Sequence, residues 1–181
     1  MRIIGGTLGG KIIKVPNDFK SRPTTDLARE ALFNILSNRY DFEELTVLDL
    51  FSGTGSILYE FYSRGTTKIT GVEINPRYVS FIKKNFEIFN IQGVQIICAD
   101  SLKYIKRAPK EHFDLIFYDP PFDFKDRLTI IEQIFDNNIL KPNGVAICEH
   151  SPNDNYSQNP YFTEARHYGK VNFSFFSKEH R

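Results

Sequence analysis

Four consecutive residues, Asp119-Pro120-Pro121-Phe122, carry the most specific chemical signal in the sequence. Each proline fixes its own φ and lacks an N–H donor, so the pair predicts a stiff turn after the preceding apolar run. In such a turn the Asp119 carboxylate and the Pro120 carbonyl can face one point, where the exocyclic amine of a nucleobase supplies two matching donors. Phe122 offers a ring on which a base can stack. We expect these residues to position an amine for a transfer reaction. The alternative is a strand that ends in a Pro-Pro turn with a core phenylalanine.

A second motif, Asp49-Leu50-Phe51-Ser52-Gly53-Thr54-Gly55, joins an apolar run to a helical pattern. The glycines allow a ligand to approach the main chain, and the start of a helix offers unpaired N–H groups. A dinucleotide fingerprint requires a third glycine where this chain has Leu58, which argues against NAD. An acid just before the glycine turn is similar to motif I of the class I methyltransferases, which bind S-adenosylmethionine. A tight turn without a ligand is the alternative.

Other polar residues are expected where neighbouring strands end, which is where ligands bind in parallel α/β sheets. Glu73 closes the second strand, where a carboxylate can accept both hydroxyls of a ribose. Asp100-Ser101 follows the third strand and can bind an adenine amine, cap a helix, or do both. Asp49 can bind the ammonium of a ligand or tie the glycine turn. The predicted cofactor-binding residues are Asp49, Phe51, Gly53, Gly55, Glu73, Ile74, Asp100, Ser101 and Asp119.

An alternation of strand and helix patterns from residue 45 onward positions these residues. Strands are predicted over 45–51, 68–74, 94–99, 113–118 and 145–149, with helices between them and a final hairpin over 161–168 and 170–176. This order is typical of an α/β fold, a doubly wound and mostly parallel seven-stranded Rossmann-like sheet with antiparallel strands at its end.

Residues 1–40 form a basic arm that precedes this sheet. They hold seven basic and three acidic side chains, for a net charge of +4, whereas residues 41–150 carry −4. Glycines between short β-prone runs predict a hairpin over 2–15 with lysines on its exposed side. Such an arm favours a polyanionic partner. The equal alternative is that its basic side chains are only solvated and bind no partner. The predicted RNA-binding residues are Arg2, Lys11, Lys14, Arg22 and Arg29.

A helix is predicted to follow the hairpin within the arm. Its cap candidates are Thr24, Thr25 and Asp26. The side chains expected to form its core-facing stripe are Leu27, Ala31, Leu32, Ile35 and Leu36.

The length of 181 residues fits one globular unit, divided into the arm at 1–40 and a catalytic part at 41–181. No run reaches the ~20 apolar residues of a membrane span, and the N-terminus is unlike a signal peptide. Cys98 and Cys148 lie in apolar runs, which indicates core thiols in a reducing cytoplasm and no metal set. We therefore expect a cytoplasmic monomer without a metal.

The chain resembles the bacterial ribosomal RNA guanine-N2 methyltransferases of the RsmD type over nearly its full length. The resemblance is carried by residues 1–6, 22–25 with 29–36, 48–55, 72–73, 119–122 and 149–151. It implies that S-adenosylmethionine methylates one guanine amine of small-subunit RNA, position 966 in the usual ribosomal numbering, within an assembled particle. It also implies that the arm binds RNA beside the cofactor pocket. The chain departs from the family pattern at Ser56 and in the tail after Ser151.

Two other functions remain open. A DNA or other RNA amino-methyltransferase, acting on adenine N6, shares the Asp-Pro-Pro-aromatic turn, but a DNA enzyme normally carries a target-recognition domain for which this chain has no room. A nucleotide-binding module without catalysis would not need Asp119 or the two prolines. The product nucleoside separates these possibilities.

Overall fold

The computed structural model describes residues 1–19, 24–121, 124 and 127–178, which form seven strands and five helices within those ranges. The strands are β1 Thr46–Asp49, β2 Lys68–Glu73, β3 Val94–Cys98, β4 Phe113–Tyr118, β5 Leu140–His150, β6 Phe162–Tyr168 and β7 Val171–Phe176. The helices are α1 Asp26–Ser37, α2 Ser56–Ser63, α3 Pro76–Ile88, α4 Ser101–Ile105 and α5 Arg127–Asp136.

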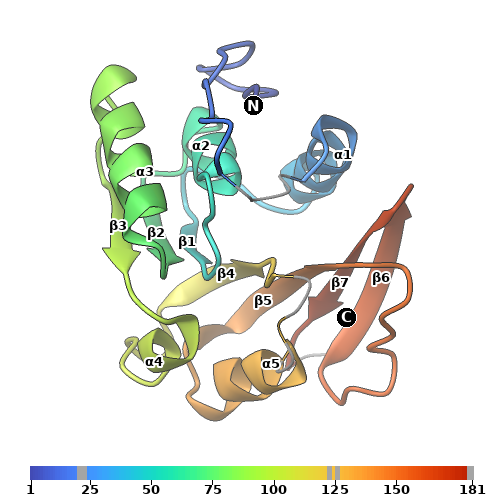
Figure 1. Ribbon diagram of the computed structural model, residues 1–181. Coiled ribbons are helices and arrows are strands. Elements are labelled where there is room, and N and C mark those ends of the chain that lie inside the picture. Colours follow the sequence, from blue (N-terminus) through green and yellow to red (C-terminus); the bar gives the residue numbers. More distant parts are fainter. Residues whose placement is uncertain (20–23, 122–123, 125–126, 179–181) are drawn as a thin grey trace.

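All seven strands belong to one sheet in the order β3-β2-β1-β4-β5-β7-β6 (Figure 1). Strands β1 to β5 pair in parallel, whereas β7 lies antiparallel to both β5 and β6. The predicted doubly wound, mostly parallel sheet with an antiparallel end is therefore confirmed.

Helices cover both faces of the sheet, with α1, α2, α3 and the N-terminal arm on one side and α4 and α5 on the other (Figure 1). Successive strand side chains alternate between the two cores. Val47 and Leu115 lie in the core under α1 to α3, whereas Leu48 and Ile116 lie in the core under α4 and α5. Because both faces are buried, the central strands are apolar almost throughout.

The parallel register brings the ends of four strands to one edge. Asp49 pairs with Gly71 on β2 and with Phe117 on β4, close to where those strands end. Tyr118 pairs with Cys148, so the residues that follow each of them also lie side by side. The acids at the ends of β1, β2, β4 and β5 are thereby gathered at the carboxyl edge of the sheet.

The predicted N-terminal hairpin is reduced to a short antiparallel contact. Arg2 and Ile12 form one isolated bridge, and the Ile3 and Ile13 amides donate to the carbonyls of Lys11 and Met1 at 3.0 and 2.8 Å. The glycine-rich connection between them turns without extended strands. The arm nevertheless joins the common core, since Ile3 and Ile13 are buried with α1 and α2. The domain boundary near residue 40 remains a prediction.

Helix α1 starts as predicted, with the Thr25 hydroxyl accepting from the Ala28 amide at 3.2 Å. Its buried face is rotated from the predicted one. Leu27 is 70% exposed, whereas Ala28, Arg29, Leu32, Phe33 and Leu36 are buried. Cys98 is also exposed, contrary to the expectation of a core thiol, because it lies on edge strand β3. Among the described residues, no helix is both long and apolar enough to span a membrane.

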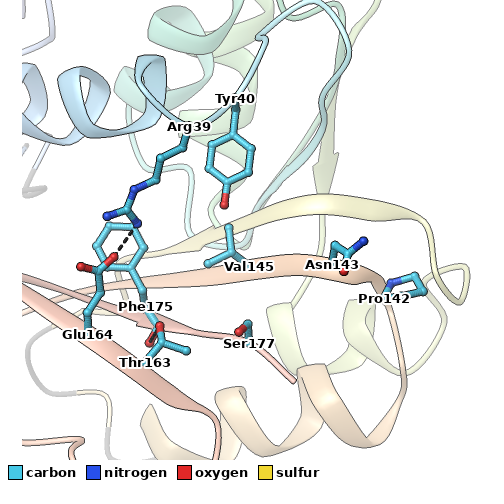
Figure 2. A pocket seen from close by; sticks show the side chains of 9 residues that line it. All are labelled: Arg39, Tyr40, Pro142, Asn143, Val145, Thr163, Glu164, Phe175 and Ser177. Atoms are coloured by element: carbon cyan, nitrogen blue, oxygen red, sulfur yellow. Dashed lines mark hydrogen bonds and ion pairs between the residues drawn. The ribbon is translucent and has the colours of Figure 1, made fainter. Parts of the chain in front are cut away.

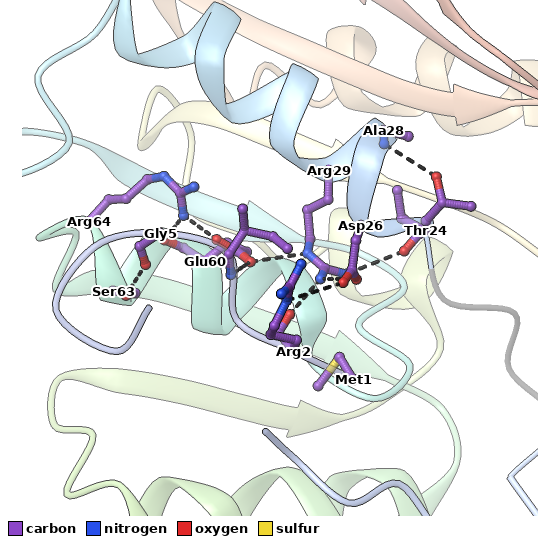
Figure 3. Close-up of polar contacts among 12 residues, drawn as sticks. Met1, Arg2, Gly5, Thr24, Asp26, Ala28, Arg29, Glu60, Ser63 and Arg64 are labelled. Atoms are coloured by element: carbon purple, nitrogen blue, oxygen red, sulfur yellow. Dashed lines mark hydrogen bonds and ion pairs between the residues drawn. The ribbon is translucent and has the colours of Figure 1, made fainter. Parts of the chain in front are cut away.

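The prediction that Arg29 contacts RNA is wrong, because its side chain is only 1% exposed and is used inside the protein (Figure 3). Its guanidinium pairs with the fully buried Glu60 at 3.1 Å and with Asp26 at 2.8 Å. It also donates to the main-chain carbonyls of Thr24 and Arg2 at 3.3 and 2.6 Å. Arg29 therefore links two parts of the arm to α2: the N-terminal segment at Arg2 and the start of α1.

Glu60 is the acceptor at the centre of this network (Figure 3). It accepts from the Ile4 amide at 2.6 Å and pairs with Arg64 as well as Arg29. Removal of one cationic partner would leave this buried carboxylate partly uncompensated.

We expect Arg29→Ala to lower the free energy of unfolding by roughly 3–5 kcal/mol, the range for breaking a buried ion pair. The matched control is Arg39→Ala, which breaks the partly exposed pair with Glu164 and should cost about 0–1 kcal/mol. Urea unfolding followed by circular dichroism measures both variants. Equal, small losses in the two would contradict the assignment of Arg29 as the buried link between the arm and α2.

Candidate active site

The glycine turn between β1 and α2 borders open space at the carboxyl edge. Gly53 and Gly55 have φ values of +51° and +85°, and the Gly55 amide donates to the Ser52 carbonyl at 2.6 Å. A Cβ at Gly55 would lie 3.0 Å from Tyr59 and 3.1 Å from Ile82, so packing alone accounts for that glycine. A Cβ at Gly53 would meet no atom of the described residues within 4 Å. A ligand can therefore approach the main chain at Gly53.

Glu73 ties the end of β2 to this turn. Its two carboxylate oxygens accept from the main-chain amides of Gly53 and Asn75, each at 2.8 Å. Burial raises the pKa of Glu73, and these amides oppose the rise. Each oxygen retains a second lone pair, so Glu73 can still accept from ligand hydroxyls. Beside it, Ile74 is 65% exposed and offers an apolar surface.

Asp49 is buried at the end of β1, and neither of its carboxylate oxygens accepts a hydrogen bond from the described residues. The nearby Ser52 hydroxyl donates instead to the Asp49 main-chain carbonyl at 3.2 Å. Burial raises the pKa of Asp49 to about 8; the nearby Ser52 side chain and the Phe51 amide oppose the rise, and the carboxylates of Asp119 and Glu73 add to it. Since a buried acid without a cationic partner is unfavourable, this position suits a ligand that brings a cation.

Glu149, at the end of β5, is a further buried acid that was not among the predicted site residues. The Thr24 hydroxyl donates to it at 2.5 Å, which connects the arm to the carboxyl edge. Burial, and then the neighbouring Asp119, raise the pKa of Glu149. Like Asp49 and Glu73, Glu149 stands at the end of an apolar run. This pattern is the sequence signal by which Glu149 could have been predicted as a site residue.

Asp119 follows β4 and lies between the ends of β1 and β5 in the sheet order. Burial raises the pKa of its carboxyl, and the charge of Arg127 opposes the rise. Arg127, the first residue of α5, donates to the carbonyls of Pro120 and Pro121 at 3.4 and 3.1 Å. No pattern in the sequence singles out Arg127. Phe122 lies outside the described residues.

The remaining predicted cofactor-binding residues, Asp100, Ser101 and Phe51, each contact another residue of the chain. Asp100 caps α4 by accepting from a main-chain amide of its first turn at 2.9 Å, so the capping interpretation is confirmed. The Ser101 hydroxyl donates to the Leu50 carbonyl and joins α4 to the glycine turn. Phe51 packs edge-on against Phe124, with ring centroids 5.5 Å apart. These contacts leave Asp100 partly exposed, with acceptor capacity for a ligand.

His150 is held between Ser174 and Ser151, with its ring nitrogens 2.8 Å from the hydroxyl of the former and 2.9 Å from the carbonyl of the latter. Burial lowers the pKa of His150. His150 is therefore a buried strand-end residue whose two ring nitrogens both have hydrogen-bond partners within the chain.

The arm presents some of its predicted basic residues to solvent. Lys11 and Lys14 are exposed, and Arg2 is largely exposed while pairing with Asp26 at 3.5 Å. Arg22 lies outside the described residues. Among those that are described, no three His, Cys, Asp or Glu residues are arranged to hold a metal.

A separate cavity of about 510 Å³ has none of the acids of the carboxyl edge in its lining. Figure 2 shows the residues that line it. Val145, in its wall, pairs with Leu115, which in turn pairs with Val47, so the cavity lies near the opposite edge of the parallel strands. Its Arg39 guanidinium pairs with Glu164 and lies 5.4 Å from the centre of the Phe175 ring. We place the candidate active site at the carboxyl edge, where the acids and the open glycine turn lie.

Comparison with known proteins gives a consistent set of relatives. The family model described as "Conserved hypothetical protein 95" matches residues 1–177. "Ribosomal RNA small subunit methyltransferase D" of Haemophilus influenzae is 36% identical over 152 residues, covering 82% of this chain and 78% of that protein. The protein of the same name from Escherichia coli K12 is 30% identical, covering 80% and 68%. A solved structure of a putative methyltransferase from Escherichia coli superimposes with a TM-score of 0.83 at 25% identity, covering 100% and 99%.

The raised pKa of Asp49 predicts a pH dependence of stability. Between an ordinary aspartate pKa of about 3.9 and the folded value of about 8, the native state holds a proton that the unfolded state has lost. Stability therefore falls as pH rises through this window, by up to about 1.4 kcal/mol per pH unit for this group. Asp49→Asn, which cannot ionise, should gain stability relative to the wild type between pH 5 and pH 8. Parallel pH slopes for the two proteins in urea unfolding would contradict this assignment.

Proposed function

We propose that this chain, which belongs to the family described as conserved hypothetical protein 95, transfers a methyl group from S-adenosylmethionine to the exocyclic N2 amine of a guanine in small-subunit ribosomal RNA. The observation that carries the proposal is the meeting of the glycine turn, Asp49 and the Asp-Pro-Pro turn at one edge of the sheet. Relatives named as small-subunit ribosomal RNA methyltransferases, at 30–36% identity, support the reaction class and the kind of RNA.

The residues at the edge fit the proposed cofactor. The buried carboxylate of Asp49, whose oxygens accept no hydrogen bond from the described residues, suits a cationic ligand, and the open space at Gly53 allows the ligand to approach the main chain. Glu73 has acceptor capacity for ribose hydroxyls, and the exposed Ile74 and the partly exposed Asp100 can contact an adenine ring and its amine. When bound, S-adenosylmethionine supplies an electrophilic methyl group on a positively charged sulfur.

Asp119 is proposed to hold the target amine. Its carboxylate accepts a hydrogen bond from one N–H of the amine. The remaining lone pair of the Pro120 carbonyl is suited to accept a hydrogen bond from the other N–H. With both protons held in one plane, the nitrogen lone pair is directed at the methyl carbon for in-line displacement, in which the bond from that carbon to sulfur would break and the methylated nitrogen would then lose one proton to solvent. Positioning, and not strong basicity, is therefore the contribution of Asp119.

The target guanine presents its amine on the base-pairing edge, so it must be unpaired to enter the site. Extrusion from a duplex costs a few kcal/mol and is easiest in a loop. We therefore propose a folded RNA, presented in an assembled small subunit, as the substrate in the cytoplasm. Labelled methyl transfer to small subunits, naked ribosomal RNA and DNA, followed by nucleoside analysis, tests this proposal. We expect N2-methylguanosine from the subunits; N6-methyladenine, or DNA as the preferred substrate, would refute it.

We expect Asp119→Ala to reduce single-turnover methyl transfer by roughly 100-fold or more, since the amine loses its oriented acceptor. Asp119→Asn should retain part of the activity, because its amide oxygen still accepts a hydrogen bond. Affinity for S-adenosylmethionine, measured by calorimetry, serves as the control and should change little in both variants. A wild-type transfer rate in the Ala variant would remove the assigned role.

The exposed side of the arm is proposed to contact RNA phosphates. Neutralising Lys11 and Lys14 together should weaken RNA binding and lower its dependence on salt, by about one unit of slope for each phosphate that the arm no longer neutralises. Lys110→Gln, at an exposed site after α4, is the matched control for loss of charge. An unchanged salt slope in the Lys11/Lys14 double variant would show that the arm carries only solvated charge.

A further inference from the structure

The Asp-Pro-Pro turn has carbonyl groups that need donors from elsewhere in the chain. Pro120 and Pro121 lack N–H groups, so neither can tie the turn through a donor of its own. The Phe124 amide donates to the Pro121 carbonyl at 2.9 Å. A second donor from the described residues is the Arg127 guanidinium, whose Nη2 reaches the Pro121 carbonyl at 3.1 Å and the Pro120 carbonyl at 3.4 Å.

Arg127 is itself held in place from the opposite side. Its side chain is only 14% exposed, and its Nη1 pairs with Asp154 at 3.4 Å. The Asp154 amide donates to the Ser151 carbonyl at 3.1 Å, and the Ser151 hydroxyl donates to the Asp154 carboxylate at 3.4 Å. One terminal nitrogen of the guanidinium thus contacts the turn, while the other contacts the segment that follows β5.

We propose that Arg127 is a positioning residue for methyl transfer, whose guanidinium holds the Pro120 and Pro121 carbonyls and thereby fixes the Asp119 carboxylate at the end of β4. This inference rests on the proposed function. An arginine suits the task because its planar fork reaches two carbonyls and a carboxylate at once, whereas a lysine supplies a single point charge.

Arg127 also acts on Asp119 through its charge. The carboxyl group of Asp119 is surrounded by Asp49 from β1 and by Cys148 and Glu149 from β5, with Arg127 as the cation from α5. The guanidinium opposes the effect of burial on the pKa of Asp119. Removal of the charge should raise that pKa, whereas Arg127→Lys should largely preserve it. The two substitutions therefore separate the charge of Arg127 from its fork geometry.

The test compares Arg127→Gln, Arg127→Lys and the exposed control Arg107→Gln, after thermal melts confirm folding. We expect single-turnover methyl transfer to fall by roughly 10- to 100-fold in both Arg127 variants, the scale of a small misplacement in an active site. The pH–rate profile should move to higher pH in the Gln variant alone. The affinity for S-adenosylmethionine should stay within a few-fold of wild type throughout. A wild-type rate in Arg127→Lys would overturn the role of the fork, and an unshifted pH profile in Arg127→Gln would overturn the role of the charge.

A second readout does not depend on catalysis. A ¹³C NMR titration of the Asp119 carboxyl in the ligand-free protein should show a raised pKa in Arg127→Gln and a wild-type pKa in Arg107→Gln. Absence of that difference would overturn the proposed contact even if the wild type methylates RNA. Conversely, a raised Asp119 pKa in a protein that methylates no RNA would refute the proposed function and leave the Arg127 contact standing.

Discussion

The crowding of buried carboxylates at one edge of a parallel sheet is the constraint on which the rest of this structure depends. The strand register gathers Asp49, Glu73, Asp119 and Glu149, and burial raises the pKa of each. Three of them have compensation within the chain: two main-chain amides for Glu73, the Thr24 hydroxyl for Glu149 and the charge of Arg127 for Asp119. Neither carboxylate oxygen of Asp49 has a hydrogen-bond partner among the described residues, and the nearby Ser52 side chain and Phe51 amide offset its burial only in part. A cationic ligand would complete this arrangement, which is the sense in which the fold and the proposed cofactor agree.

The N-terminal arm is part of the same arrangement and not a separate attachment. Glu60 on α2 binds Arg29 on α1, and Arg29 in turn donates to the Thr24 carbonyl. The Thr24 hydroxyl then reaches Glu149 on β5. A buried ion pair therefore places the arm against the carboxyl edge, with Lys11 and Lys14 facing solvent. If the arm binds RNA as proposed, this chain of contacts connects RNA to the acids of the site.

The sequence predicts those features that depend on short-range chemistry. The glycine turn, the alternating strands and the acids after apolar runs all follow from local patterns, and the mostly parallel sheet with an antiparallel end follows from general rules of connection. The features that it misses depend on partners distant in the chain. The sequence alone predicts that Arg29 is free to bind a polyanion, because no local pattern indicates its ion pair with Glu60. The rotated buried face of α1, with Leu27 exposed, follows from that pairing. Likewise, no local pattern relates Thr24 to Glu149 or Arg127 to the carbonyls of the turn.

The most direct test is calorimetry of S-adenosylmethionine binding in buffers of different ionisation enthalpy near pH 7.5, with S-adenosylhomocysteine as the matched ligand that lacks the sulfonium charge. A cation beside carboxyl groups of raised pKa stabilises their ionised forms, so binding should release protons to the buffer. Both ligands carry the α-ammonium that Asp49 is proposed to bind, so we predict proton release with both, and a smaller release with both in Asp49→Asn; any excess for S-adenosylmethionine reports on the sulfonium. Proton release that is unchanged in Asp49→Asn for both ligands would contradict the claim that this buried acid meets the cation of the ligand.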